Sequence, residues 1–340
     1  MIIFVREISN ISSLNPTQEA ALERLLWTYG RGIHVLWMPV DLVEELLTLT
    51  CFSSYAKRAL YELKSAAVFS KNLLESEFNF RIVIDFSTRH ALRLDRNELI
   101  AGYENALDER FLLEPVMLTE NEIDAAIYQS FSNAFFSDRK NLRTSYTLKL
   151  EAQGGGGSDT VKKFARYLEE KRPLLCFIDS DKKHPKGCFG ATSQHFNKYP
   201  KGLNAGYYLE ILNVHEIENL IPVSLINLLY PDHSYGAIYN NPACRKYKGY
   251  PDHKKGLTVK DAKEQDETYQ DNFWREFYHL EDNANLCGTF SNLIQKTKNY
   301  LEKTTPHKLR ELLDDRLDAE LYNISRTVTD WGISMRRTLS

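Results

Sequence analysis

The sequence predicts an α/β protein built around a parallel sheet that is flanked by helices. Between residues 111 and 230, apolar strand-like runs alternate with single amphipathic helices, a pattern typical of parallel strands joined by right-handed crossovers. The chain has 340 residues, of which 43% are hydrophobic and 26% charged, as in globular proteins. This length favours two domains, or one large domain with an appendage, each able to bury a sizeable core.

The pattern divides the chain into three regions. Residues 1–110 are predicted to form an N-terminal mixed α/β unit of unknown role, residues 111–230 the main sheet, and residues 231–340 a basic loop followed by a C-terminal helical layer. The strands expected in the first region are Ile2–Val5, Ile33–Met38 and Phe80–Phe86, and its helices are Pro16–Tyr29, Leu42–Leu49 and Ser54–Leu74.

The second and third regions differ in regularity. The second is expected to contain strands at Phe111–Leu118, Tyr146–Leu150, Leu174–Ile178 and Tyr207–Val214, and helices at Ile123–Phe136 and Asp159–Glu170. In the third, Pro231–Asp261 is rich in Pro, Gly, Asn, Lys and Tyr and predicts an irregular loop. The helices expected after this loop are Asp271–His279, Asn285–Tyr300 and Lys308–Ser325.

Charge and cysteine content exclude several classes of protein. Lys and Arg number 43 against 46 Asp and Glu, so the net charge of −3 excludes a generally basic nucleic-acid binder but not a local basic patch. The five cysteines form no CxxC pair, which argues against a disulfide framework and a zinc ribbon. No apolar run reaches the roughly 18 residues of a membrane span, so we expect a cytoplasmic protein without membrane contact.

Acidic side chains follow three of the predicted strands. Glu120 and Asp124 follow the first strand of the main sheet, and the other two pairs are Asp179 with Asp181 and Glu216 with Glu218. Because the carboxyl ends of parallel strands meet at one edge of a sheet, these carboxylates are expected to lie close together. They would repel one another unless cations bind between them, which predicts hard divalent metals such as Mg²⁺ or Mn²⁺.

A glycine cluster follows the remaining strand. Glycine lets a backbone or a phosphate approach closely and exposes N–H groups at the start of a helix, so a phosphate-binding turn is expected at Gly154, Gly155, Gly156 and Gly157. With Ser158 these residues spell a common engineered linker, but a single copy between a strand and a helix favours a native turn.

These parts together resemble the Toprim domain of topoisomerases, primases and overcoming-lysogenization-defect nucleases. The resemblance lies in MLTENEID at 117–124, the strand and glycine turn at 148–157, and FIDSD at 177–181. HEIENLIP at 215–222 is similar to the acidic strand end of Toprim-like defence nucleases, including the small subunit of the PARIS antiphage system. Asn121 stands where the family usually has glycine. The resemblance covers residues 111–230, about a third of the chain.

The resemblance implies two-metal phosphodiester hydrolysis without a protein nucleophile. Glu120, Asp179 and Asp181 are expected to hold one ion, and Asp124, Glu216 and Glu218 to be available for a second. Lys182 and Lys183 are candidates to stabilise the pentavalent phosphate. Other lysines in flexible loops suit the nucleic-acid backbone, among them Lys186, Lys254 and Lys255.

The function expected from this resemblance is a metal-dependent endonuclease acting on DNA or RNA, as an effector in antiphage defence and possible homodimer. The chain contains no GxxxxGK[ST] motif, so any ATPase would be a separate partner subunit. Two alternatives remain open at this point. One is a primase- or topoisomerase-like phosphoryl transferase, and the other is a non-catalytic adaptor with an acidic docking edge.

Overall fold

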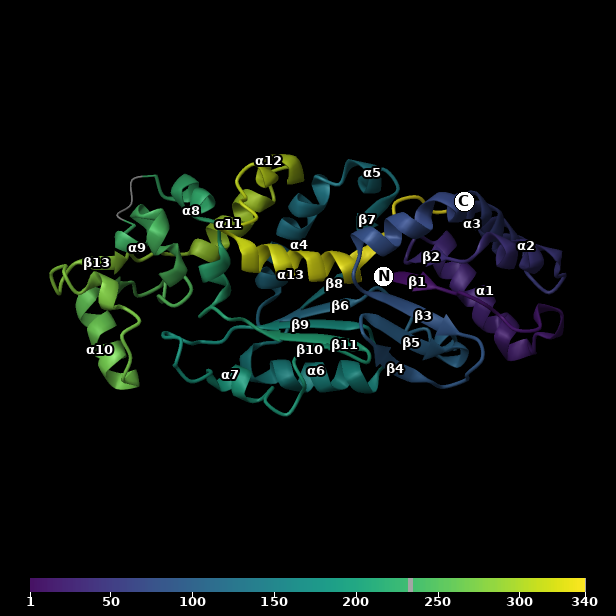
Figure 1. Ribbon diagram of the computed structural model, residues 1–340, viewed down its shortest axis with the longest axis horizontal. Coiled ribbons are helices and arrows are strands. Elements are labelled where there is room, and N and C mark those ends of the chain that lie inside the picture. The colour runs from purple at the N-terminus through teal and green to yellow at the C-terminus, as the bar shows by residue number, and fades with distance from the viewer. Residues whose placement is uncertain (232–234, 340) are drawn as a thin grey trace.

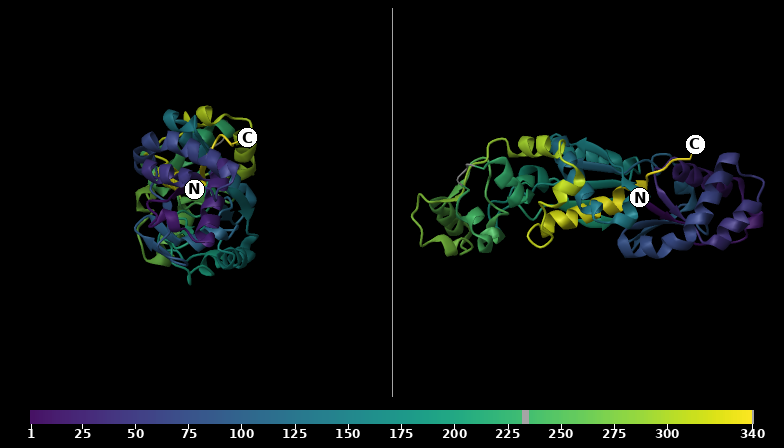
Figure 2. Two further views of the ribbon diagram at one scale, coloured as in Figure 1. Left: turned by 90° about the vertical axis from the view of Figure 1, so that its right-hand side faces the viewer. Right: turned by 90° about the horizontal axis from the view of Figure 1, so that it is seen from above.

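A computed structural model describes residues 1–231 and 235–339 and confirms the α/β class predicted from the sequence. The molecule is elongated, with an N-terminal sheet at one end, a central sheet in the middle and a small lobe of the C-terminal region at the other end (Figure 1). Figure 2 shows the molecule from one end and from above, and in the view from above the three parts again lie in a row. None of the described helices is both long and apolar enough to cross a membrane.

The N-terminal sheet has five strands in the order β2-β1-β3-β5-β4. All neighbours are parallel except β4, which pairs antiparallel with β5 at the edge. The strands are β1 (Ile2–Phe4), β2 (Val35–Trp37), β3 (Arg81–Asp85), β4 (Leu92–Asp95) and β5 (Glu98–Gly102), and the helices are α1 (Pro16–Gly30), α2 (Val40–Thr48) and α3 (Ser54–Glu77).

The central sheet also has five strands, in the order β10-β11-β9-β6-β8. Its strands are β6 (Val116–Thr119), β8 (Glu151–Gly154), β9 (Leu174–Ile178), β10 (Gly202–Asn204) and β11 (Tyr207–Ile211), and its main helices are α4 (Glu122–Ser137) and α6 (Thr160–Glu169). Only β10 runs antiparallel to its neighbour. Because β6 has β8 on one side and β9 on the other, the strand order reverses between β6 and β9, where ligands of such sheets bind.

The two faces of the central sheet are covered by different helices. Met117, Leu175 and Phe177 belong to the apolar core that contains the buried face of α4, whereas Leu118 and Cys176 belong to the core around α6. This alternation is the period of two that a strand buried on both faces requires. The sheet edge is therefore fixed in position, and the loops at its carboxyl end start from rigid supports.

The second strand of the central sheet differs from the prediction. We expected a strand at Tyr146–Leu150 closed by a turn from Glu151, but β7 (Tyr146–Leu148) leaves the sheet and pairs antiparallel with β14 (Ile333–Met335). The segment from Glu151 becomes β8 and pairs with β6. Its residues are only partly buried at the sheet edge, so they carry little of the apolar signal that marks a buried strand.

The C-terminal region also corrects the prediction. The stretch Pro231–Asp261, of which residues 232–234 lie outside the described part, contains short turns of helix, β12 and the start of α10, a helix that the sequence pattern missed. Of the helices expected afterwards, Asp271–His279 is only a short 3₁₀ turn, and Asn285 begins a strand. The α-helices and strands between residues 223 and 332 are α8 (Val223–Leu229), α9 (Ala237–Asn240), β12 (Leu257–Thr258), α10 (Val259–Tyr269), β13 (Asn285–Cys287), α11 (Leu293–Leu301), α12 (Pro306–Arg310) and α13 (Ala319–Gly332).

Helix α13 packs against α4 of the central part and against Phe80 beside the N-terminal sheet. It packs along α4, where the rings of Phe135 and Tyr322 meet edge to face with centroids 5.0 Å apart. At its other end Trp331 stacks on Phe80 beside the N-terminal sheet, with centroids 4.4 Å apart. The yellow helix that crosses the middle of Figure 1 is this element.

Candidate metal centre at the carboxyl end of the central sheet

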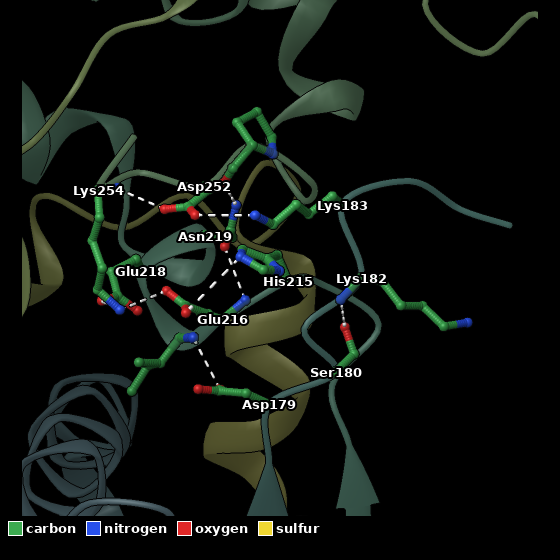
Figure 3. Close-up of polar contacts among 12 residues, drawn as sticks. Asp179, Ser180, Lys182, Lys183, His215, Glu216, Glu218, Asn219, Asp252 and Lys254 are labelled. Atoms are coloured by element: carbon green, nitrogen blue, oxygen red, sulfur yellow. Dashed lines mark hydrogen bonds and ion pairs between the residues drawn. The ribbon is translucent and has the colours of Figure 1, made fainter. Parts of the chain in front are cut away.

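The strand-end carboxylates gather on one edge of the central sheet. Glu120 follows β6 and Asp179 follows β9, the two strands at which the strand order reverses. Glu216 and Glu218 lie on the segment after β11, and the backbone N–H of Ile217 in that segment donates to Asp179 Oδ1 at 3.1 Å (Figure 3). The expectation that topology brings the three acidic segments to one edge therefore agrees with the structure.

Glu120 has a buried carboxylate oxygen that lacks a hydrogen-bond partner. Its Oε1 atom is buried and accepts no hydrogen bond. Burial, and then the charge of Asp181, raise the pKa of Glu120 to about 7, although hydrogen bonding from the Asp179 backbone and the Thr192 side chain opposes the shift. An ionised carboxylate in such a position is stabilised by a nearby cation.

Burial also raises the pKa values of Asp179 and Asp124. Burial raises the pKa of Asp179 well above its usual range, with further contributions from the charges of Asp124, Glu120 and the two glutamates after β11. Burial also raises the pKa of Asp124 to about 6. Asp124 has a structural role as well, because it accepts a hydrogen bond from the Asn121 backbone N–H at 3.1 Å and so caps α4.

Asp181 is held by an unusual backbone conformation. Its φ of 58° lies in the left-handed region, and its N–H donates to the carbonyl of His215 at 2.9 Å. The side chain packs so closely on Gly190 that a Cβ there would lie 1.8 Å from Asp181 Oδ2. The buried Ser180 bonds the carbonyl of Val214 through its hydroxyl, which ties the DSD turn to the segment after β11.

The glycine turn fits tightly against the segment that follows β6. The N–H groups of Gly155 and Gly156 donate to the carbonyls of Thr119 and Glu120 at 2.7 and 2.9 Å. Gly156 and Gly157 have φ of 84° and 66°, which favour glycine, while a Cβ on Gly154 would lie 2.7 Å from the backbone nitrogen of Glu122. The glycine turn thus positions Glu120. The N–H groups of Gly155 and Gly156 already donate to backbone carbonyls, so these two are not free to bind a phosphate.

Glu216 and Glu218 already have a cationic neighbour. The Nζ atom of Lys254 lies 2.9 Å from Glu216 Oε2 and 3.2 Å from Glu218 Oε1. Burial, and then the charge of Glu216, raise the pKa of Glu218 to about 7, whereas Lys254 lowers it. Glu216 also caps the 3₁₀ turn at Ile217–Leu220, in a capping box with Asn219.

The remaining lysines expected to touch phosphate are dispersed. Lys183 pairs with Asp252 at 3.3 Å and Lys186 with Asp271 at 3.3 Å. Lys182 points away from the carboxylates in Figure 3, and its Nζ lies 4.2 Å from the centroid of the Phe189 ring. Lys255 is exposed and makes no ion pair within the described part of the chain.

The donor chemistry fits a hard divalent cation only in part. Oxygen ligands are what Mg²⁺ and Mn²⁺ prefer, and the unpartnered Glu120 oxygen beside Asp179 and Asp181 fits such an ion. Among the described residues, however, no three Asp, Glu, His or Cys side chains converge as they would around a bound metal. The set Asp124, Glu216 and Glu218 fits less well, because each member has a partner in the chain.

Several residues at this edge escaped the sequence analysis. Ser180, Gly190 and Asp252 each position a predicted site residue, but serine, glycine and aspartate in loops are too common to single out. Asn219 was recoverable in principle, because Glu216 and Asn219 have the spacing of a capping box. Its side-chain amide donates to the carbonyls of Lys248 at 2.8 Å and Pro251 at 3.0 Å.

The comparisons with known proteins add no further constraint. The chain matches no protein-family profile, no curated protein and no solved structure.

Proposed function

We propose that this protein is a divalent-metal-dependent nuclease that hydrolyses phosphodiester bonds at the carboxyl end of the central sheet. The observation that carries the proposal is the buried, unpartnered Oε1 of Glu120 at the point where the strand order reverses, beside Asp179 and Asp181. Carboxylates that repel one another at a ligand-binding edge favour a bound cation. The Toprim resemblance of residues 111–230 agrees with this assignment.

In this proposal Glu120, Asp179 and Asp181 hold Mg²⁺ or Mn²⁺, which would supply Lewis-acid activation of water and of the phosphoryl oxygen. The raised pKa values of Glu120 and Asp179 mean that binding a cation also releases protons from the site. Gly190 leaves room for the Asp181 carboxylate, and the glycine turn fixes the backbone of Glu120. These residues thus orient the ligands before substrate arrives.

Nucleic acid is the substrate class that the surroundings favour. Lys182 and Lys201 both lie over the ring of Phe189, 4.2 and 4.4 Å from its centroid, next to the DSD turn. Two ammonium groups around one aromatic ring, with no acidic partner within 4 Å among the described residues, favour an approaching phosphate chain. As part of this proposal, the protein acts in the cytoplasm as an antiphage effector alongside a separate ATPase subunit.

Cleavage assays with purified protein test the proposal. Labelled single-stranded DNA, duplex DNA and transfer RNA are incubated with Mg²⁺, with Mn²⁺ or with a chelator. We expect metal-dependent cleavage by the wild type and none by Asp179→Ala, with Mn²⁺ binding measured in parallel by calorimetry. Absence of both cleavage and metal binding would contradict the proposed function, and full activity of Asp179→Ala would contradict the site. A covalent protein–nucleic acid adduct would indicate a phosphoryl transferase instead.

A further inference from the structure

The position of Lys254 bears on how many cations the site holds. Its ammonium group reaches both Glu216, at 2.9 Å, and Glu218, at 3.2 Å, and so lies where these two carboxylates would hold a divalent ion (Figure 3). The carboxylate side chains are 17% and 8% exposed, whereas the lysine is 63% exposed. Lys254 therefore covers the buried Glu218 carboxylate and the partly buried Glu216 carboxylate from the solvent side.

The loop that carries Lys254 is anchored on several sides, so the contact is built into the fold. This loop comprises residues 251–255. The carbonyl of Pro251 accepts from the Asn219 amide at 3.0 Å, and Asp252 pairs with Lys183 at 3.3 Å. The Asp252 carboxylate also accepts from the backbone N–H of Lys254 at 3.0 Å. At the far side, the carbonyl of the buried His253 accepts from the N–H of Phe290 at 2.7 Å.

Electrostatics explain why a cation is needed at this point. Glu216 and Glu218 are separated by one residue, and both are close enough to Lys254 to share its ammonium group. Although burial opposes it, hydrogen bonding to Glu216 and the charge of Glu218 raise the pKa of Lys254 above its ordinary range. The lysine is therefore charged across the physiological range, and a divalent ion on the same oxygens would face this positive charge at close range.

We propose that Lys254 takes the place of a second divalent cation, so that the wild-type protein binds one ion and a second only when the lysine charge is removed. The inference rests on the proposed function, because the single ion is the one assigned to Glu120, Asp179 and Asp181. It replaces the two-ion expectation of the sequence for the resting protein. It also gives Lys254 a role at the carboxylates instead of on phosphate.

Counting bound Mn²⁺ tests this inference without any cleavage assay. Free Mn²⁺ is followed by electron paramagnetic resonance while the metal is titrated into wild-type protein and into Lys254→Met. We expect one equivalent for the wild type and two for Lys254→Met. Lys254→Arg keeps the charge and Lys255→Met alters the adjacent exposed lysine, so each should bind one equivalent. Adding Glu216→Gln and Glu218→Gln to Lys254→Met should return the count to one.

The outcomes separate this inference from the proposed function. If the wild type bound two equivalents of Mn²⁺, or a folded Lys254→Met bound only one, the proposed role of Lys254 would be wrong. Neither result would contradict the proposed nuclease function. No Mn²⁺ on any variant would overturn both. Thermal unfolding in chelator verifies that each variant is folded, and the wild-type count remains decisive even if Lys254→Met does not fold.

Discussion

The N-terminal and central sheets have the same topology but very different carboxyl ends. Reading from the second strand of each, the orders are β2-β1-β3-β5-β4 and β8-β6-β9-β11-β10, with the last strand antiparallel in both. Each sheet therefore has a reversal of strand order beside its first strand. The chain thus contains the same potential ligand-binding edge twice.

Among the described residues, a buried carboxylate oxygen without a hydrogen bond occurs at the central edge and not at the N-terminal one. At the end of β3, Asp85 accepts from the N–H and hydroxyl of Ser87 at 2.8 and 2.6 Å, so its carboxylate closes a local turn. After β5, Glu104 pairs with Arg89 at 2.5 Å. At the central edge, Glu120 has an unpartnered oxygen, and burial, followed by like charges, raises its pKa and that of Asp179. The two sheets share their topology, and the pairing of the acidic side chains distinguishes their carboxyl ends.

The largest expected effect compares the aspartates at the two third strands. Asp179→Asn should lower nucleic-acid cleavage by about a hundredfold or more, because a bound metal contributes several kcal/mol and each 1.36 kcal/mol is a factor of ten. Asp85→Asn should cleave like the wild type, since Asp85 only closes a turn. Initial rates under saturating Mg²⁺ measure both. If Asp85→Asn lost as much cleavage activity as Asp179→Asn, the carboxyl end of the central sheet would not be the cleavage site that distinguishes the two sheets.

The second effect concerns stability against pH. The pKa of Glu120 is about 7 in the fold against 4.5 ordinarily, so between these values the folded state holds a proton that the unfolded state lacks. The stabilisation is complete below pH 4.5 and is lost as the pH rises through 7. It amounts to at most about 3 kcal/mol for Glu120. Denaturant unfolding in chelator at pH 5 and pH 8 should reveal it, with a smaller difference in Glu120→Gln.

A control for this titration lies beside the N-terminal sheet. Burial raises the pKa of Asp330 to about 7, and its Oδ2 accepts from the N–H of Asn79 at 3.2 Å. Asp330→Asn should also reduce the pH dependence of the unfolding free energy. At pH 8, Mn²⁺ should stabilise the wild type and Asp330→Asn but not Glu120→Gln. An equal gain in Glu120→Gln would contradict the assignment of Glu120 as a ligand.

Two crowded glycines provide the third comparison. A Cβ on Gly190 would meet the Asp181 carboxylate at 1.8 Å, and a Cβ on Gly102 would meet the Arg89 carbonyl oxygen at 2.5 Å. Replacing either by alanine should cost about 1–3 kcal/mol of stability through overpacking. Calorimetry should detect weaker Mn²⁺ binding, by about tenfold, for Gly190→Ala alone. Unchanged affinity in that variant would argue against Asp181 as a ligand.

The smallest effect concerns two lysines that lie over aromatic rings. Lys182 lies 4.2 Å from the centroid of Phe189 beside the central edge, and Lys71 lies 5.3 Å from that of Trp37 in the N-terminal unit. Lys182→Ala should weaken nucleic-acid binding severalfold and lower the salt slope by about 1, whereas Lys71→Ala should change neither. Fluorescence anisotropy at several salt concentrations measures both, and identical behaviour would show that the lysine beside the site has no special role.

The sequence predicted the buried strands better than the exposed ones. Leu174–Ile178 was placed correctly, because a strand buried on both faces is a short apolar run. The edge strand Glu151–Gly154 was assigned to a turn, since its half-exposed residues lack that signal. Helix α10 was missed for a related reason, because only three of its residues are buried and most of the rest are polar.

By itself, the sequence determined the α/β class and the positions of Glu120 and Asp179, because a carboxylate directly after a buried strand lies at the sheet edge. It also identified the segments that carry Asp181, Glu216 and Glu218, but Glu216 and Glu218 follow the end of β11 at Ile211 by several residues, so their placement depends on the loop. The tertiary structure alone decided which of these carboxylates lack a partner. Lys254 and Glu216 are 38 residues apart, and Glu120 and Asp181 belong to different strand ends. Such pairings depend on where the loops fold in space, and charge patterns along the chain contain no record of that.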